Sequence, residues 1–158
     1  MTTSPGYSTT PEPGQPPPLL LIGWKEYVVF PEWGLRRVRA KIDTGACTSA
    51  LDVAGYDIEE TPAGAIAHLR LTLNRRLPDK VKLVSAPVVR SVVVRNSGGI
   101  AERRPVVEAL VRLGPVEKRI HLTLTRRTGM RCRMLLGRAA LNGHFVVDVR
   151  SKYILRGS

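Results

Sequence analysis

Lys41-Ile42-Asp43-Thr44-Gly45-Ala46 is the segment on which the interpretation of this 158-residue sequence depends most. The residues before it alternate between basic and apolar side chains, which predicts a strand that ends at Ile42. The segment then presents the Asp43 carboxylate, Gly45 allows a tight turn and the close approach of another backbone, and the Thr44 hydroxyl can hold the loop. Asp43 is therefore a candidate catalytic acid, although an ordinary Asx-type turn uses the same residue types.

A second segment, Met134-Leu135-Leu136-Gly137-Arg138-Ala139-Ala140-Leu141, combines a short apolar strand with a Gly-Arg step. The residues from Arg138 to Leu141 favour a helix, and we expect no other helix in the chain. This segment, together with the Asp-Thr-Gly tripeptide, is far more specific than either part alone.

Most of the sequence from Gly23 onward alternates with a period of two, between Gly, Pro and Asn residues that indicate turns. This pattern is typical of short strands in a sandwich or barrel. The clearest case is Arg119 to Thr125, in which Ile120, Leu122 and Leu124 alternate with polar residues. We predict an all-β fold, a closed barrel or sandwich with one short helix. The other predicted strands are Lys25–Phe30, Arg37–Ile42, Ala67–Leu73, Val88–Val94, Val106–Leu113, His144–Val149 and Ser151–Leu155.

Residues 1–18 differ in composition from the rest of the chain. They hold six of the twelve prolines and have no long apolar run, so they cannot bury enough surface to offset the entropy lost on ordering. We predict a flexible tail over 1–18 and one folded domain over 19–158. A secretory signal is not recognisable, and Leu19 to Ile22 is too short to cross a bilayer. A cytoplasmic protein without membrane contact is expected, and Cys47 and Cys132 lack the spacing of a metal or redox pair.

The formal net charge of +12 indicates a negatively charged partner. The charge belongs to the predicted domain, because Glu12 is the only charged residue of the tail. Both nucleic acid and an acidic peptide satisfy these electrostatics. The low aromatic content, 5%, provides poorly for base stacking, so nucleic acid is the less favoured partner.

The strand followed by Asp43-Thr44-Gly45-Ala46, and the later Leu135-Leu136-Gly137-Arg138, resemble the two hallmark motifs of retropepsins. The resemblance implies that the second strand packs beneath a catalytic loop. Val94 to Ile100, between two predicted strands, is similar to the glycine-containing flap hairpin of retropepsins, although a plain surface hairpin has the same pattern. The long interval between the two motifs implies an insertion, which we place around residues 55–78.

The stretch from Leu21 to Leu155 is similar to a bacterial retropepsin-like family that has been labelled an ATP-dependent zinc protease family. Its members resemble companions of RimK-type ligases, which add glutamates to the C-terminus of a ribosomal protein. The matching motifs are Ile22-Gly23-Trp24, Lys41-Ile42-Asp43-Thr44-Gly45-Ala46, Arg104-Pro105-Val106-Val107, Met134-Leu135-Leu136-Gly137-Arg138 and Phe145-Val146-Val147-Asp148-Val149.

The resemblance implies an aspartic endopeptidase that acts on an acidic peptide, with removal or trimming of glutamate tails as the expected reaction. It assigns catalysis to Asp43, Thr44 and Gly45. Substrate contacts are expected from Ala46, Ser97, Gly98, Gly99, Arg104 and Arg138, and Arg138 can equally support the loop. The alternatives are a basic β-barrel module that binds RNA, the ribosome or acidic protein tails, and a scaffold that keeps the fold without activity.

Aspartic peptidases need two carboxylates that share one proton, and the sequence has one Asp-Thr-Gly. A homodimer would place two Asp43 residues at its twofold axis, unless Asp52 or Asp148 is the second carboxylate. Ala46 has no hydroxyl to stabilise ionised Asp43, so we expect a pH optimum nearer neutrality than in pepsin-like enzymes unless Thr48 or Ser49 reaches the carboxylate.

No metal and no cofactor is expected. His68, His121 and His144 are scattered, and neither a His-Glu-x-x-His motif nor a Walker pattern is present. The basic pairs can rim a cleft that pairs with substrate carboxylates, or can be solvated surface. They are Arg36-Arg37, Arg75-Arg76, Arg103-Arg104 and Arg126-Arg127.

Overall fold

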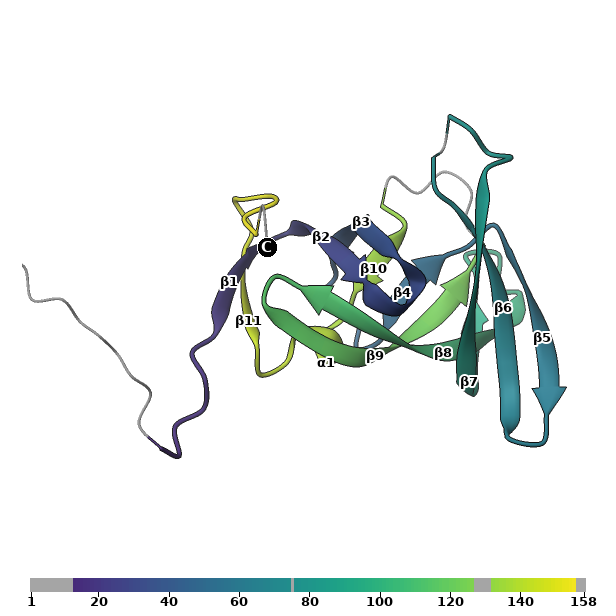
Figure 1. Cartoon of the computed structure of the whole chain (residues 1–158), viewed down its shortest axis with the longest axis horizontal. Coiled ribbons are helices and arrows are strands. Elements are labelled where there is room, and N and C mark those ends of the chain that lie inside the picture. Colours follow the sequence, from purple (N-terminus) through teal and green to yellow (C-terminus); the bar gives the residue numbers. More distant parts are fainter. Residues whose placement is uncertain (1–12, 75, 127–131, 156–158) are drawn as a thin grey trace, which may run out of the picture.

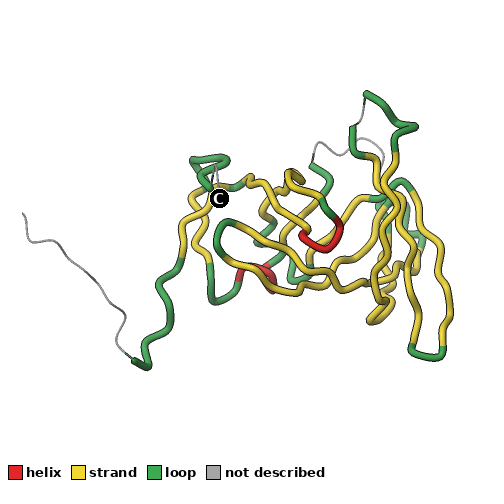
Figure 2. The backbone as a smooth tube through the Cα atoms, in the orientation of Figure 1, coloured by secondary structure: helices red, strands yellow, loops and turns green. Residues whose placement is uncertain are grey.

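The structure is a computed structural model that describes residues 13–74, 76–126 and 132–155. Strands dominate it, and its helical turns are one 3₁₀ turn and one short α-helix (Figure 2). The strands are β1 (Leu20–Gly23), β2 (Lys25–Phe30), β3 (Leu35–Ile42), β4 (Ser49–Asp52), β5 (Gly55–Thr61), β6 (Gly64–Thr72), β7 (Val81–Arg95), β8 (Ala101–Leu113), β9 (Val116–Thr125), β10 (Met134–Leu136) and β11 (Phe145–Asp148); the helices are η1 (Pro31–Trp33) and α1 (Arg138–Leu141).

Six of the strands close into a barrel. Their order is β2-β3-β10-β4-β9-β8, and the pairing of Val29 with Arg112 joins β8 back to β2. The predicted all-β barrel with one short helix after the Leu-Leu-Gly-Arg strand is therefore confirmed. Closure leaves the six strands with few free edges, and the side chains that point inward form the core.

The inward faces of the barrel strands form a continuous apolar core. In β9, Ile120, Leu122 and Leu124 are buried while His121 between them is exposed, as the alternation in the sequence predicts. Phe30 stacks on Trp33, with ring centroids 4.7 Å apart. Burial of a large apolar side chain contributes about 1.5–3 kcal/mol, so these alternating residues hold the barrel together.

A second group of strands extends the sheet beyond the barrel. The first part of β7 pairs with β6, and its later part pairs with β8, so β7 connects the barrel to the β5–β6 hairpin. This hairpin lies at the opposite end of the molecule from β1 and β11 (Figure 1). It occupies much of the region, residues 55–78, in which the sequence implies an insertion.

β1 and β11 form a separate two-stranded parallel sheet, with Leu21 opposite Val146. The predicted strand at Ser151–Leu155 is wrong: these residues form a turn in which Tyr153 has a positive φ of 54°. In this turn the backbone N–H groups find acceptors without pairing to another strand. Ser151 N donates to Asp148 O, Tyr153 N to Lys25 O, and Leu155 N to the buried carboxylate of Glu26.

Part of the sequence-based prediction falls outside the described residues. The residues concerned are 1–12 of the predicted tail, Arg75 and Arg127. The rest of the predicted tail, residues 13–18, forms neither strand nor helix and is exposed. None of the described helices is long and apolar enough to cross a membrane. The cytoplasmic location stays a prediction.

Candidate active site

The Asp43 loop follows directly from β3 and is held by its own backbone. Asp43 N donates to Leu136 O at 2.9 Å, and Ala46 N donates to Asp43 O at 3.3 Å. Gly45 N donates to the Asp43 carboxylate at Oδ1, at 3.0 Å. The carboxylate is thus oriented by a backbone N–H, an arrangement that suits an anion, and it is partly exposed to solvent.

β10 and α1 support this loop from below, as the second motif predicts. β10 lies parallel to the end of β3, with Leu136 opposite Ile42. At the start of α1, Arg138 N donates to Ala46 O at 2.8 Å and Ala139 N donates to Cys47 O at 2.9 Å. The Arg138 guanidinium donates to Thr44 O at 2.8 Å. Both the backbone and the side chain of Arg138 thus contact the loop itself.

Gly137 lies where β10 meets the loop and is packed against backbone. A Cβ at this position would be 2.7 Å from Cys47 O and equally close to the carbonyl of Thr48. Gly137 N donates to the buried Ser49 hydroxyl at 3.0 Å. Only glycine fits this close approach of two segments, and Ser49 holds Gly137 through this contact.

An open pocket of about 580 Å³ adjoins Asp43. Three of its lining residues are neighbours on adjacent strands: Lys41 of β3 lies between Lys25 of β2 and Leu135 of β10. The two lysines place positive charge beside the carboxylate and attract anionic ligands. The lining consists of Trp24, Lys25, Lys41, Ile42, Asp43, Cys132 and Leu135.

Asp148, one possible second carboxylate in the chain, is engaged elsewhere. It lies at the end of β11 and accepts hydrogen bonds from Arg150 at 2.9 and 3.1 Å and from Ser151 at 3.0 Å. The side-chain hydrogen bond from Arg150 lowers the pKa of Asp148 to about 2. A carboxylate that stays ionised in this way is poorly suited to share a proton with Asp43.

Asp148→Asn tests this pKa. Because the folded-state pKa is lowered, ionised Asp148 stabilises the fold above its unfolded-state pKa of about 3.9, and the contribution is lost as the pH falls toward about 2. We expect the variant to have a lower free energy of unfolding than the wild type at neutral pH and a smaller deficit near pH 2. Urea denaturation at both pH values measures this, and an equal deficit at both would contradict it.

The predicted flap residues form the turn between β7 and β8. Asn96 Oδ1 accepts hydrogen bonds from Gly98 N and Ile100 N, both at 3.0 Å, and Gly99 has a φ of 78°. Arg104, in β8, forms an ion pair with Glu102 at 3.1 Å. Within the described residues no hydrogen bond or ion pair joins this hairpin to the Asp43 loop, so the substrate contacts of Ser97, Gly98, Gly99 and Arg104 stay predictions.

The histidines have ordinary surface partners. His68 contacts Glu59 at 2.6 Å and Ser85 at 2.8 Å, and His121 lies 3.0 Å from Arg90. Over the described ranges, no group of three or more His, Cys, Asp or Glu side chains is placed to hold a metal ion.

One protein family matches almost the whole folded part of the chain. The family described as "Retropepsin-like aspartic endopeptidase RimB", or RimB-like, matches residues 21–157. The chain belongs to the RimB-like family. The family resemblance read from the Asp43 and Gly137 segments is thereby confirmed, and these RimB-like motifs meet in the structure at the β3–β10 junction.

Curated relatives of this RimB-like chain are longer proteins. A "Probable alpha-L-glutamate ligase" of Parasynechococcus marenigrum is 32% identical over 138 residues, which are 86% of this chain and 29% of that protein. The protein of the same name from Desulfotalea psychrophila is 33% identical over 133 residues, 81% of this chain and 28% of that protein. The chain thus spans less than a third of the length of these relatives.

A solved structure supports the same fold. The Legionella pneumophila protein Lpg0085, described as of unknown function, superposes with a TM-score of 0.72 and 23% sequence identity. The match covers 86% of this chain and 98% of that chain. At this identity the likeness shows the fold alone.

The structure gives four residues a place at the site that the sequence did not assign to them. Lys25, Lys41 and Trp24 line the pocket beside Asp43, and Ser49 holds Gly137. Lys41 had a signal in the sequence, because it lies two residues before Asp43 in an alternating strand. The positions of Lys25 and Trp24 beside Asp43 depend on the pairing of β2 with β3, which the sequence alone does not predict.

Proposed function

We propose that this RimB-like chain is an aspartic endopeptidase of acidic peptides and that Asp43 is its catalytic carboxylate. The supporting observation is the Asp43 loop itself: Gly45 N orients the carboxylate, and Arg138 and Gly137 hold the loop from below. Two lysines stand in the adjoining pocket, where they would attract an acidic substrate.

The proposed reaction uses two Asp43 carboxylates that share one proton. The ionised carboxylate takes a proton from water while the oxygen of that water attacks the scissile carbonyl carbon, and the protonated carboxyl group gives its proton to the carbonyl oxygen. The carbon–nitrogen bond then breaks as the amine receives the proton that the first carboxylate took from water, and the hydroxyl formed from the carbonyl oxygen returns its proton to the second carboxylate. Because like charges about 3 Å apart cannot both ionise, one of the pair stays protonated.

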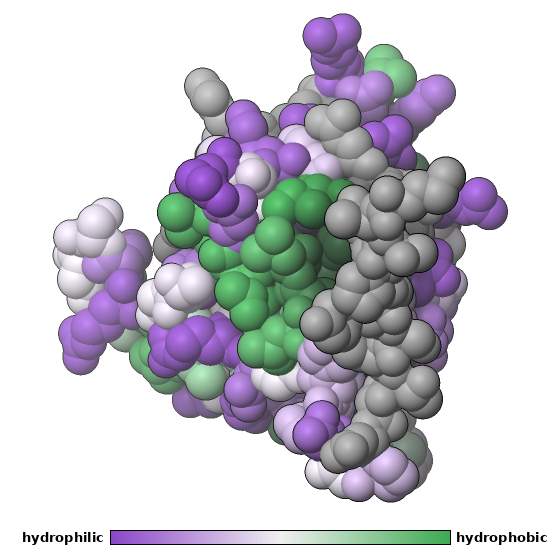
Figure 3. Space-filling view, turned by 90° about the vertical axis from the view of Figure 1, so that its left-hand side faces the viewer, coloured by the Kyte–Doolittle hydropathy of each residue, from purple (hydrophilic) through white to green (hydrophobic). Residues whose placement is uncertain are grey.

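A homodimer would supply the second Asp43, and the sheet of β1 and β11 is its proposed contact surface. Apolar side chains gather on this end of the molecule (Figure 3). The surface is connected to the site, because Ile42 N donates to Trp24 O immediately after β1. The exposed apolar residues of this surface are Leu19, Leu21, Val146, Val149 and Ile154.

Val146→Asp tests this contact surface. Val146 is 46% exposed and lies opposite Leu21 on the outer face of the sheet, so a carboxylate there is tolerated in the monomer but opposes burial in an interface. We expect light scattering to show a dimer for the wild type and a monomer for the variant, with loss of cleavage. Leu83→Asp, at a site that is 72% exposed on β7, is the matched control and should stay dimeric.

A persistent wild-type monomer that cleaves peptide would contradict the dimer. Asp52 could not supply the second carboxylate, because Asp52 N donates to Arg133 O while Asp43 N donates to Leu136 O, at the other end of β10, so another acidic group would have to be found. The outcome would not affect the assignment of Asp43.

The proposed substrate is a glutamate tail, such as the tail that ligases of the RimK type add to a ribosomal protein. We expect cleavage of a peptide with a glutamate extension and much weaker cleavage when glutamines replace the glutamates, because the lysines beside Asp43 gain charge pairing with the first peptide alone. Mass spectrometry of the products measures this and maps the scissile bond. The preference should weaken with added salt. Equal cleavage of both peptides would contradict the acidic substrate.

A further inference from the structure

A second and larger pocket lies beside the first half of β3, away from the Asp43 loop. Its volume is about 610 Å³, within the range of ligand sites of about 300–1,000 Å³. It lies before the point at which β10 begins to pair with β3, at Met134 opposite Ala40. The mechanism proposed above does not use it.

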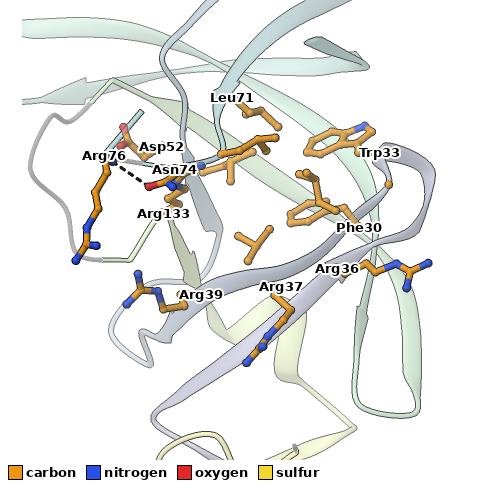
Figure 4. A pocket seen from close by; sticks show the side chains of 15 residues that line it. Phe30, Trp33, Arg36, Arg37, Arg39, Asp52, Leu71, Asn74, Arg76 and Arg133 are labelled. Carbon is orange, nitrogen blue, oxygen red and sulfur yellow. Dashed lines mark hydrogen bonds between the residues drawn. The ribbon is translucent and has the colours of Figure 1, made fainter. Parts of the chain in front are cut away.

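The pocket has an apolar floor and a cationic rim. Phe30, Trp33 and Leu71 are buried in the floor, and Figure 4 shows their side chains on one side of the cavity. The guanidinium groups of Arg36, Arg37, Arg39 and Arg76 point away from this floor (Figure 4). The rim arginines are Arg36, Arg37, Arg39, Arg76 and Arg133, and Asp52 is the single acidic residue among the described lining residues.

The rim arginines of β3 are not neutralised by the protein. The Arg37 guanidinium lies 4.4 Å from the centre of the Tyr27 ring, which holds the side chain without removing its charge. In the part of the chain that the structure describes, no carboxylate forms an ion pair with Arg36, Arg37 or Arg39. Guanidinium groups in this state can bind ligand carboxylates in pairs of hydrogen bonds.

A stripe of positive charge connects this pocket to the Asp43 loop. Arg37, Arg39 and Lys41 are exposed while Ala40 and Ile42 are buried, so the three cations share the outer face of β3. Arg39 is four residues from Asp43 along an extended chain, about 13 Å at about 3.3 Å per residue. A peptide in the pocket beside Asp43 could therefore reach the second pocket with a few extended residues.

We propose that the second pocket is an anchor site for an acidic peptide segment that carries one large apolar side chain. The apolar side chain enters the floor formed by Phe30, Trp33 and Leu71, and the flanking carboxylates pair with Arg36 and Arg39 on the rim. This proposal rests on the proposed peptidase function, and it names a second place at which the same substrate class is held. The site strengthens binding and sets the distance between the anchor and the scissile bond.

Binding is measured in the Asp43→Asn variant, so that cleavage plays no part. Isothermal titration calorimetry compares a short glutamate peptide with one central phenylalanine, the same peptide with alanine in its place, and one with glutamine for every glutamate. We expect the first to bind best and each of the others to bind about tenfold more weakly or worse, because one loses apolar burial and the other loses charge pairing.

Two double variants locate the site. Arg36→Gln with Arg39→Gln removes two rim charges, and we expect about tenfold weaker binding of the acidic peptide. Arg90→Gln with Lys118→Gln removes the same charge at positions that line neither pocket, and binding should change by less than about twofold. Leu73→Gln, at a lining residue that is 51% exposed, tests the apolar wall without disturbing the core.

Trp33 reports occupancy directly. The chain has two tryptophans, so Trp24→Phe leaves Trp33 as the single tryptophan, and the acidic peptide should shift its emission when tryptophan is excited selectively. Equal binding by both double variants, or no response of Trp33, would overturn the anchor site. A single-stranded RNA that binds with the same dependence on Arg36 and Arg39, where the peptide does not bind, would also overturn it.

The two proposals fail separately. Rim-dependent binding without cleavage by the wild type would retain the anchor site and reject the peptidase. Cleavage with binding and kcat/KM that do not depend on the rim charges would reject the anchor site and retain the peptidase.

Discussion

Asp43→Asn is expected to lower kcat for a glutamate-extended peptide by about 10³-fold or more, because the amide can neither accept a proton from water nor donate one to the scissile carbonyl. General acid–base groups contribute about 10²–10⁴-fold each, and in a homodimer the substitution removes both. Asparagine keeps the size of the side chain and an oxygen that can accept the hydrogen bond from Gly45 N. The loss should therefore be chemical and not structural.

Thermal unfolding and light scattering serve as the controls for this variant. We expect a Tm within a few degrees of the wild type and an unchanged oligomeric state, with the acidic peptide still bound. Asp57→Asn is a matched carboxylate substitution, since Asp57 lies on β5 and pairs with Arg70 at 2.6 Å, and it should keep the activity. Equal cleavage by the wild type and Asp43→Asn would reject Asp43 as the catalytic group.

Gly137→Ala is expected to lower the free energy of unfolding by about 3 kcal/mol, at the upper end of the cost of inserting a methyl group into a packed site. The new Cβ would be 2.7 Å from Cys47 O and from both carbonyl atoms of Thr48. These are backbone atoms, and Cys47 O is fixed by the hydrogen bond from Ala139 N. Relief of the clash moves the Asp43 loop, so cleavage should fall as well.

Gly98→Ala is the control for this effect. A Cβ at Gly98 would approach only the side-chain oxygen of Asn96, at 3.3 Å, which can shift. Urea denaturation should show a change of less than about 1 kcal/mol for Gly98→Ala, as at ordinary surface sites. A cost at Gly137 no larger than the cost at Gly98 would contradict the account of how β10 supports the loop.

Local patterns were sufficient to predict most of the barrel. The alternation in β9 and in β2 indicated their strands, and Arg138–Leu141 was predicted as the helix that the structure shows. β1, β4 and β5 were missed because their short or polar segments carry no clear period. Ser151–Leu155 was wrongly predicted as a strand. Its backbone N–H groups donate to Asp148, in the same turn, and to Lys25 and Glu26, which are remote in the sequence. No local pattern indicates these hydrogen bonds.

The candidate site was predictable only in part. Two motifs in the sequence identified the Asp43 loop and the segment beneath it, because each motif is continuous in the chain. The pocket beside Asp43 and the pocket with the arginine rim were not predictable, because they depend on β3 lying between β2 and β10. Pairing between strands about ninety residues apart, such as Leu136 with Ile42, leaves no local signal in one sequence.

Activity in mixtures of wild-type and Asp43→Asn chains shows whether two Asp43 carboxylates from two chains form one site. After unfolding and refolding together in equal amounts, subunits pair at random, and about half of the wild-type chains acquire a partner that carries the substitution. If the two carboxylates form one site, cleavage per wild-type chain falls to about half and falls further with excess variant. Cleavage per wild-type chain that stays constant at every mixing ratio would contradict a shared site.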